Sequence, residues 1–218
     1  MKVTKIRPSD GFPANTSERQ SHSKIDLNEE LFQGDGAFDR LYPGHIVAQS
    51  ARHWTPLSVA CKAAEFLAEA GARVLDIGSG VGKFCLVGAR YFPEATFYGV
   101  EQRHELVMYA EDAKDYLHLP NAHFIYANMT QINFKEFDHF YFYNSFYENV
   151  DSEGCIDNTI DTSYSLYNYY TQYLLVALEQ KPAGTRLVTY HSIEEEIPSS
   201  YCLADVSFDS LLKMWIKK

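Results

Sequence analysis

The sequence predicts a doubly wound α/β domain with a mainly parallel sheet and helices on both faces. Short apolar runs alternate along the chain with longer segments whose apolar residues recur at helical spacing, which is typical of βαβ units. The first apolar run, residues 73–77, ends directly in a glycine-rich turn that leads into a helical segment. Right-handed crossovers make such a domain doubly wound, and its parallel strands place their carboxyl ends at one edge, where we expect the ligand site.

Each element follows from a local pattern. The first helix is expected to begin after Trp54, with Thr55 as N-cap and Pro56 at its first position, and Gly71 suits its end. Further helices are expected from the glycine-rich turn to Tyr91, over residues 103–117 and from about residue 163 to 180. Strands are expected over residues 73–77, 96–100, 123–127, 138–143 and 185–190, with two more within 200–217.

Composition bounds the class of protein. The chain has 218 residues, 46% of them apolar, which is enough for the core of one domain. Its formal net charge of -10 disfavours contact with phosphate backbones, so we expect no bulk nucleic-acid binding. No run of 18 apolar residues is present, so we expect no membrane partner. The oligomeric state is left open by the sequence.

The cysteines and the amino terminus indicate a cellular compartment. The four cysteines are widely spaced, without a CxxC pair, and predict neither a zinc site nor a disulfide framework. Residues 1–12 lack the apolar block of a signal peptide. We therefore expect a cytoplasmic protein, and no spacing of His, Asp or Glu predicts a metal site. Residues 1–30 contain only seven apolar side chains, so we expect a polar N-terminal arm followed by a domain over 31–218.

The turn after the first strand, residues 76–82, indicates a nucleotide or nucleoside ligand. Glycines at Gly78, Gly80 and Gly82 permit a tight turn and leave room for close approach of a ligand. A P-loop is excluded because three residues, not four, separate Gly78 from Gly82, and Phe84 follows Lys83. The dinucleotide pattern GxGxxG would require a glycine at Lys83, so a nicotinamide oxidoreductase is a weak alternative. The S-adenosylmethionine loop, acidic-x-Gly-x-Gly-x-Gly, fits with Asp76 as the acid.

Polar residues follow the next two predicted strands. Glu101 ends the second strand, where an acidic side chain can bind a ribose diol. Asn128 follows the third strand, where an amide can face an adenine edge while Met129 packs on the ring. Each of these predictions has a structural alternative. The glycine turn could be a tight turn without a ligand, Glu101 a solvated acid at a strand end, and Asn128 a turn-forming asparagine.

The fourth strand is followed by the segment Asn144-Ser145-Phe146-Tyr147-Glu148-Asn149, where we expect the transfer chemistry. Methyl transfer proceeds in line and depends on positioning, desolvation and electrostatics more than on acid–base chemistry. Aromatic faces stabilise cations, and the Asn144 carbonyl could orient an amine hydrogen. Asn144, Phe146 and Tyr147 are therefore the candidate catalytic residues, with loop packing as the alternative for the two aromatic side chains.

Residues 73–191 resemble the core of a class I S-adenosylmethionine-dependent methyltransferase. VLDIGSGVG (74–82) matches motif I, GVEQ (99–102) the ribose-binding strand end, and FYFYNSFYE (140–148) motif IV. The resemblance implies a seven-stranded sheet with a reversed C-terminal hairpin. It also implies S-adenosylmethionine as the cofactor, with S-adenosylhomocysteine as the product. It implies cofactor contacts at Thr55, Asp76, Gly78, Ser79, Gly80, Gly82, Glu101, Gln102, Asn128, Met129 and Asn144.

Two narrower resemblances concern the methyl acceptor. The run VLDIGSGVGKFCL with GVE is similar to the non-SET protein-lysine methyltransferases, which also carry an Asn and a Phe after strand four. The run 144–147 resembles the Asn-Pro-Pro-Tyr motif of amino-methylating enzymes, although Ser145 and Phe146 replace the two prolines. We therefore expect methyl transfer to a nitrogen of a protein lysine or a small molecule. A module that binds S-adenosylmethionine or a nucleoside without transferring a methyl group is the alternative.

Overall fold

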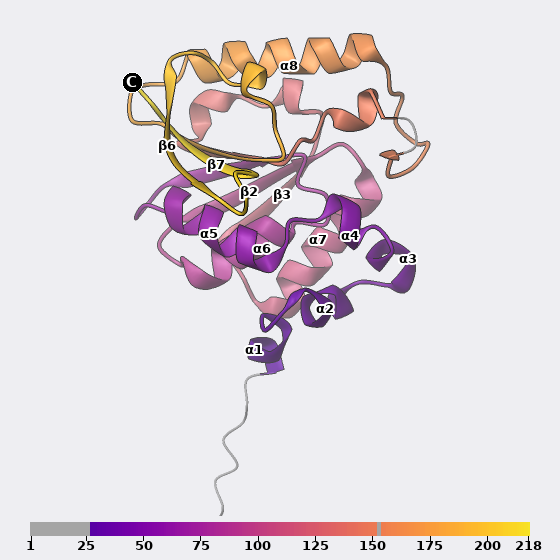
Figure 1. Ribbon diagram of the computed structural model, residues 1–218. Coiled ribbons are helices and arrows are strands. Elements are labelled where there is room, and N and C mark those ends of the chain that lie inside the picture. Colours follow the sequence, from indigo (N-terminus) through magenta and orange to yellow (C-terminus); the bar gives the residue numbers. More distant parts are fainter. Residues whose placement is uncertain (1–26, 152–153) are drawn as a thin grey trace, which may run out of the picture.

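The computed structural model describes residues 27–151 and 154–218 (Figure 1). Its centre is a seven-stranded sheet in the order β3-β2-β1-β4-β5-β7-β6. The first five strands are parallel, and β7 runs antiparallel to both β5 and β6. Their bounds are β1 Arg73–Ile77, β2 Thr96–Glu101, β3 Ala122–Tyr126, β4 His139–Phe142, β5 Arg186–Tyr190, β6 Tyr201–Ser207 and β7 Leu212–Lys217. The predicted fold, including the reversed C-terminal hairpin, is confirmed.

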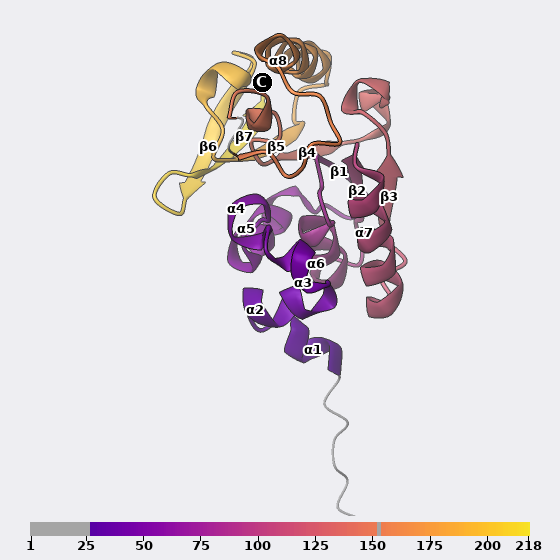
Figure 2. The same cartoon turned by 90° about the vertical axis from the view of Figure 1, so that its right-hand side faces the viewer.

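Helices cover both faces of the sheet. Figure 2 shows α8 (Tyr164–Glu179) on one side, with α5 (Leu57–Leu67), α6 (Lys83–Tyr91) and α7 (His104–Leu117) on the other. The alternation of side chains along β1 explains this arrangement, because Val74 packs in the same core as α5 and α6, while Leu75 packs in the core under α8. Between β3 and β4 the chain forms two short 3₁₀ turns, η2 (Met129–Gln131) and η3 (Phe134–Glu136).

A group of short helices precedes α5. These are α1 (Leu27–Leu31), α2 (Asp35–Phe38), η1 (Asp39–Leu41), α3 (Gly44–Val47) and α4 (Ser50–His53). Two of them, α2 and η1, are held by a buried cation, because the ammonium of Lys83 lies 2.7 Å from Asp35 and 2.9 Å from Asp39. The predicted polar arm lies mostly outside the described residues, and its last part, residues 27–30, begins α1. The division at residue 30 therefore stays a prediction.

The start of α5 differs from the prediction. Pro56, and not Thr55, is its N-cap residue. The carboxylate of Asp35, in α2, accepts a hydrogen bond of 2.9 Å from the N–H of Leu57. This bond satisfies one of the main-chain N–H groups that the first turn of α5 leaves without a partner inside the helix. The hydroxyl of Thr55 instead hydrogen-bonds the Tyr141 hydroxyl at 2.9 Å, which ties this segment to β4.

The order of the strands reverses between β1 and β4, and the segments that follow these two strands touch. The Ser145 hydroxyl donates to the carbonyl of Ile77 at 2.5 Å. A Cβ on Gly78 would lie 2.5 Å from the Cβ of Ser145, so only glycine fits there. Within residues 27–151 and 154–218, no helix combines the length and the apolar character needed to cross a bilayer.

Candidate active site

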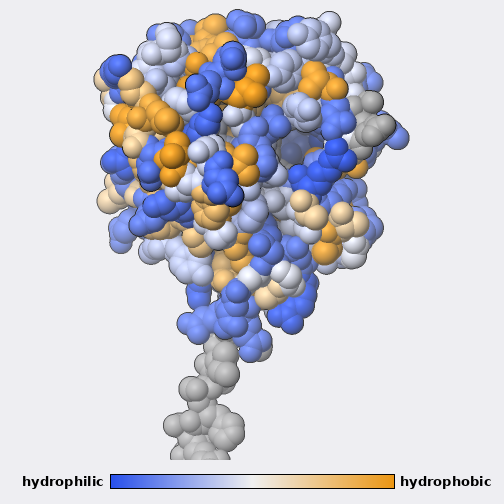
Figure 3. Space-filling view, in the orientation of Figure 1, coloured by the Kyte–Doolittle hydropathy of each residue, from blue (hydrophilic) through white to orange (hydrophobic). Residues whose placement is uncertain are grey.

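A cavity of about 430 Å³ opens at the carboxyl ends of the parallel strands, where Figure 3 shows the surface hollowed. This volume lies within the range of small-molecule sites, roughly 300–1,000 Å³. The segments after β1, β2, β3 and β4 all contribute to its wall, as does the end of α4. The position is the one expected for ligands of a doubly wound sheet.

The three glycines of the turn after β1 have different roles. All three have positive φ angles, +77° at Gly78, +53° at Gly80 and +81° at Gly82. No atom lies within 4 Å of the position that a Cβ on Gly80 would take, and Gly80 lines the cavity. A Cβ on Gly82 would instead lie 2.4 Å from the Phe124 ring, so this glycine permits packing behind the cavity wall. Gly80 is thus the glycine that leaves room for a ligand.

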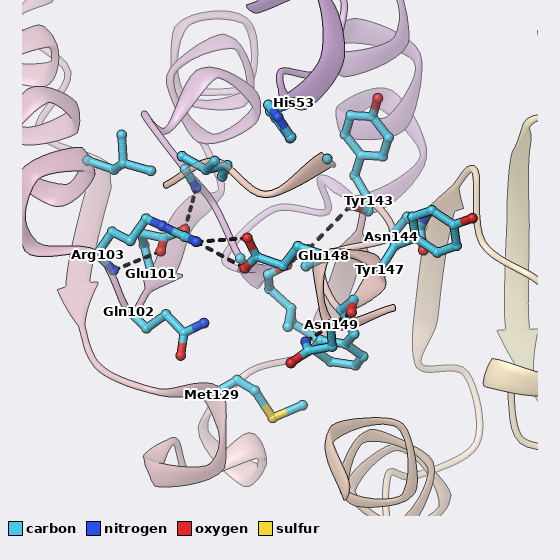
Figure 4. Close-up of a pocket in the computed structure, with 18 of the residues that line it drawn as sticks. His53, Glu101, Gln102, Arg103, Met129, Tyr143, Asn144, Tyr147, Glu148 and Asn149 are labelled. Atoms are coloured by element: carbon cyan, nitrogen blue, oxygen red, sulfur yellow. Dashed lines mark hydrogen bonds and ion pairs between the residues drawn. The ribbon is translucent and has the colours of Figure 1, made fainter. Parts of the chain in front are cut away.

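Glu101 lies at the end of β2 and is only 5% exposed. Its two carboxylate oxygens accept one main-chain N–H each, from Gly80 at 3.1 Å and from Arg103 at 2.8 Å (Figure 4). A carboxylate has about four acceptor positions, so one remains on each oxygen. Burial raises the pKa of Glu101, while the N–H groups and the Arg103 charge oppose that rise. The remaining positions suit two adjacent hydroxyl donors, such as those of a ribose.

Asp76 and Ser79 lie behind the cavity wall and do not line it. The carboxyl of Asp76 is fully buried and accepts a hydrogen bond from the thiol of Cys85 at 3.7 Å. Burial raises the pKa of Asp76 to about 8. Ser79 packs over β2, since a Cβ on Gly99 would lie 2.5 Å from its hydroxyl. Both residues shape the glycine turn from behind, and Thr55 likewise lies outside the wall.

Asn128 lines the cavity, but its side-chain amide is already bonded to protein groups. Its Oδ1 caps η2 by accepting from the N–H and the hydroxyl of Thr130, at 3.0 and 2.9 Å. Its Nδ2 donates to Gln102 at 3.0 Å and to the Tyr170 hydroxyl at 2.9 Å. Asn128 therefore joins three segments of the wall, in which Gln102, Met129 and Tyr170 also lie.

The segment after β4, residues 144–149, is called here the acceptor loop. Asn144 begins it with a φ angle of +41°, an uncommon conformation for a residue other than glycine. Phe146 is buried, with its ring centre 4.8 Å from that of Phe142 and 5.6 Å from that of Tyr170. Tyr147 is 50% exposed. Asn144, Phe146 and Tyr147 all line the cavity with Gly80 and Glu101, so the structure brings the two predicted groups together.

Three carboxylates and two guanidinium groups line the same cavity. The carboxylates are Glu101, Glu148 and Asp151, and the guanidinium groups are Arg52 and Arg103. Arg52 lies 2.7 Å from Asp151, and Arg103 lies 2.7 Å from Glu148. The wall therefore carries an excess of negative charge, which suits a cationic ligand.

Arg103 and Tyr170 were not predicted as site residues, and Glu148 was predicted only as part of the segment that matches motif IV. Arg103 and Glu148 are 45 positions apart, and Asn128 and Tyr170 are 42 apart, so no local pattern joins them. The only sequence signal for Arg103 is its place two residues after Glu101. Among residues 27–151 and 154–218, no group of three or more His, Cys, Asp or Glu side chains could hold a metal, and the expectation of a metal-free protein stays a prediction.

The reversed sheet, the glycine turn after β1 and the carboxylate ending β2 together define a class I methyltransferase, whose methyl donor is S-adenosylmethionine. Residues 68–215, more than half of the chain, match the family model described as "Methyltransferase domain". The chain belongs to this methyltransferase family. It is therefore an enzyme of methyl transfer, and neither a nicotinamide oxidoreductase nor a binding module without transferase activity is supported by the family match.

Curated relatives match only a part of the chain. A tRNA (guanine-N(7)-)-methyltransferase of Synechococcus sp. (strain JA-3-3Ab) is 49% identical over 55 residues, 25% of this chain and 23% of the relative. The protein of the same name from Microcystis aeruginosa is 44% identical over 55 residues, 25% of this chain and 26% of the relative. The match thus spans about a quarter of the length of these relatives.

Solved structures share the fold over more of the chain. An RNA methyltransferase from Salinibacter ruber, in complex with S-adenosyl-L-homocysteine, has a TM-score of 0.50 and 20% identity, covering 75% of this chain and 92% of that one. TrmN from Thermus thermophilus has a TM-score of 0.50 and 20% identity, covering 74% of this chain and 52% of that one. At these identities the likeness is one of fold.

The comparisons overturn one expectation, that of a protein or small-molecule partner without nucleic-acid binding. The curated relatives are named as tRNA methyltransferases, so the net charge of -10 was not a sound ground for excluding nucleic acid. The physical reason is that a net charge averages the whole chain, whereas an acceptor base is held by local shape, stacking and hydrogen bonds.

Proposed function

We propose that this enzyme transfers a methyl group from S-adenosylmethionine to a ring nitrogen of a base in RNA, with guanine N7 of a tRNA as the first acceptor to test. The partial relatives named as tRNA (guanine-N(7)-)-methyltransferases support the RNA acceptor. The observation that carries the proposal is that the buried carboxylate of Glu101 and the aromatic acceptor loop line one cavity.

Glu101 and Gly80 form the cofactor side of this proposal. S-adenosylmethionine supplies a methyl group that is activated by its attachment to a sulfonium. Glu101 would accept the two ribose hydroxyls at the positions that its main-chain donors leave open. Gly80 provides space against the main chain, and Gln102 and Met129 also line the cavity. Asp76, Ser79, Gly82 and Thr55 would support the site from behind, without contact to the cofactor.

Phe146, Tyr147 and Tyr170 form the acceptor side. These three residues line the cavity together with Asn144, and an unstacked base can stack on aromatic rings. Stacking on one aromatic ring is worth about 1–3 kcal/mol per base. The side-chain amide of Asn144 could hydrogen-bond an edge of that base and turn the nitrogen lone pair toward the methyl group.

The charges of the cavity suit a nitrogen that becomes cationic. The lone pair of a ring nitrogen such as guanine N7 attacks the methyl carbon, the bond from carbon to sulfur breaks, and the positive charge moves to the ring. No proton leaves in this step. The excess of carboxylates in the wall and the aromatic faces beside them favour a cation on either side of the transfer.

The test is methyl transfer from methyl-labelled S-adenosylmethionine to an unmodified tRNA transcript, followed by chromatography of the nucleosides. We expect label in 7-methylguanosine. A matched transcript in which 7-deazaguanosine replaces guanosine has a C–H at the reacting position and should take up none. Label in both transcripts would contradict guanine N7 and retain RNA as the acceptor. Label in neither, with a cofactor-binding enzyme, would overturn the RNA proposal.

Two further assignments accompany this proposal. The cytoplasmic location rests on the cysteines Cys61, Cys85, Cys155 and Cys202, which are all free, as expected in a reducing compartment. The methyltransferase domain over residues 31–218 rests on the packing of residues from Leu31 onward with the core beneath the sheet.

A further inference from the structure

Arg103 contacts both sides of the cavity. Its main-chain N–H donates to Oε1 of Glu101 at 2.8 Å. Its guanidinium binds Glu148 through two hydrogen bonds, Nη1 to Oε1 at 3.1 Å and Nη2 to Oε2 at 2.7 Å. Figure 4 shows this guanidinium facing the Glu148 carboxylate between β2 and the acceptor loop. One residue thus joins the ribose-binding carboxylate to the segment that would hold the acceptor.

The ion pair is buried. The side chain of Arg103 is 4% exposed and that of Glu148 is 11% exposed, and Nε of Arg103 also donates to Oδ1 of Asp157 at 3.2 Å. Burying a charge pair costs desolvation free energy and adds little net stability, so its main effect is on geometry. A bidentate pair fixes both distance and orientation. Glu148 lies in η4 (Tyr147–Asn149), so the pair fixes η4 relative to the end of β2.

We propose that Arg103 is a positioning residue that couples cofactor binding at Glu101 to the placement of the acceptor loop. A ligand that donates to Glu101 holds its carboxylate, the carboxylate holds the main chain of Arg103, and the guanidinium then holds Glu148. Such coupling is reciprocal, so an ordered acceptor loop also favours cofactor binding. The inference rests on the proposed contact between Glu101 and the ribose, and it is independent of the identity of the acceptor.

The main-chain contact allows the two functions of Arg103 to be separated. Any side chain at position 103 other than proline keeps the N–H that holds Glu101. Arg103→Met alone would leave Glu148 buried without its partner, which is strongly destabilising. The double variant Arg103→Met/Glu148→Met removes both charges at similar volume, a change that is often tolerated. Asp157→Asn is the matched control, because it changes only the outer partner and leaves the bidentate pair intact.

The experiment measures hydrogen exchange in the acceptor loop with and without S-adenosylhomocysteine, together with calorimetric affinity for the same compound. In the wild-type chain and in Asp157→Asn, we expect the ligand to slow exchange across residues 144–149. In the double variant, we expect the dissociation constant to rise less than about fivefold while the ligand-induced protection disappears. Thermal unfolding of each variant checks that it is folded.

Three results would overturn the proposal. Equal protection in the double variant would show that the loop responds to the cofactor without Arg103. Loss of binding in parallel with loss of protection would place Arg103 in the cofactor site itself. A wild-type chain that does not bind S-adenosylhomocysteine would remove the cofactor contact on which the inference rests. Absence of RNA methylation, by contrast, would contradict the proposed acceptor alone.

Discussion

The main-chain N–H of Gly80 donates to the carboxylate of Glu101 at 3.1 Å, across the ends of two neighbouring strands. The glycine turn after β1 and the acidic end of β2 are therefore one unit, although 21 positions separate them in the chain. Gly80 leaves space for the ligand, and Glu101 presents the acceptor oxygens beside that space.

Gly80→Ala is expected to block the ligand while the protein stays folded. An added methyl group would occupy the open position in the cavity wall, so the affinity for S-adenosylhomocysteine should fall at least about tenfold, equal to 1.4 kcal/mol. Gly184→Ala is the matched control, since Gly184 also has a positive φ angle, +90°, and no atom within 4 Å of its Cβ position, but lies outside the cavity. Both variants carry the backbone strain, and only Gly80→Ala should lose affinity in calorimetry. Equal affinities would contradict the assignment of the cavity.

The buried carboxyl of Asp76 is expected to make the stability of the fold depend on pH. Its pKa is raised by burial to about 8 in the folded chain, against about 3.9 for an unperturbed aspartate. Between these values the folded chain holds a proton that the unfolded chain has released. The free energy of unfolding therefore falls as pH rises from about 4 to about 8, by at most about 1.4 kcal/mol per pH unit for one proton.

Asp76→Asn tests this dependence by urea unfolding over the same pH range. The neutral amide cannot titrate, so the decline should be smaller than in the wild-type chain. Burial raises the pKa of Glu101 and of Glu196 as well, so part of the decline should remain. Asp205→Asn, on the exposed face of β6, is the control and should keep the wild-type slope. An unchanged slope in Asp76→Asn would show that Asp76 is ionised in the fold.

His53 provides a test of the proposed acceptor. It lines the cavity, and burial together with the nearby Arg52 charge lowers its pKa, which favours the neutral imidazole. A ring nitrogen with a free lone pair needs no base, so His53→Ala should reduce kcat by far less than the ~100-fold typical of a lost general base. The measurement is kcat against pH for both proteins. A hundredfold loss, with disappearance of an acidic limb in the profile, would indicate an acceptor that must release a proton.

The sequence predicted the fold well because its parallel core has strong local signals. The first strand was predicted with its observed bounds, residues 73–77. The helix after the glycine turn was predicted to end at Tyr91, where it does end. The short helices before α5 could not be predicted, because a four-residue helix has no periodicity of its own. Their stability comes from contacts such as that of Lys83 with Asp39, 44 positions away.

The site was predicted in part for the same reason. Gly80, Glu101 and Phe146 follow predicted strands, and the rule for doubly wound sheets was sufficient to bring them together. The rule could not tell which side chains at the strand ends face the cavity. Ile77 lines the cavity and Asp76, the residue before it, does not, because successive residues of a strand point to opposite faces. Arg103 and Glu148 form a contact between distant segments, which only the folded chain brings together.

Titration calorimetry with S-adenosylhomocysteine tests the central claim, that Glu101 holds the ribose of the cofactor. The wild-type chain should bind one molecule, and Glu101→Gln should lose about 1–3 kcal/mol of binding free energy, a rise in the dissociation constant of roughly five- to 150-fold. Glu196→Gln is the matched control, since Glu196 is also buried and accepts two hydrogen bonds, from Tyr167 and Ile193, but lies outside the cavity. It should bind like the wild-type chain. Equal affinity in a folded Glu101→Gln variant, or the same loss in both variants, would contradict the account.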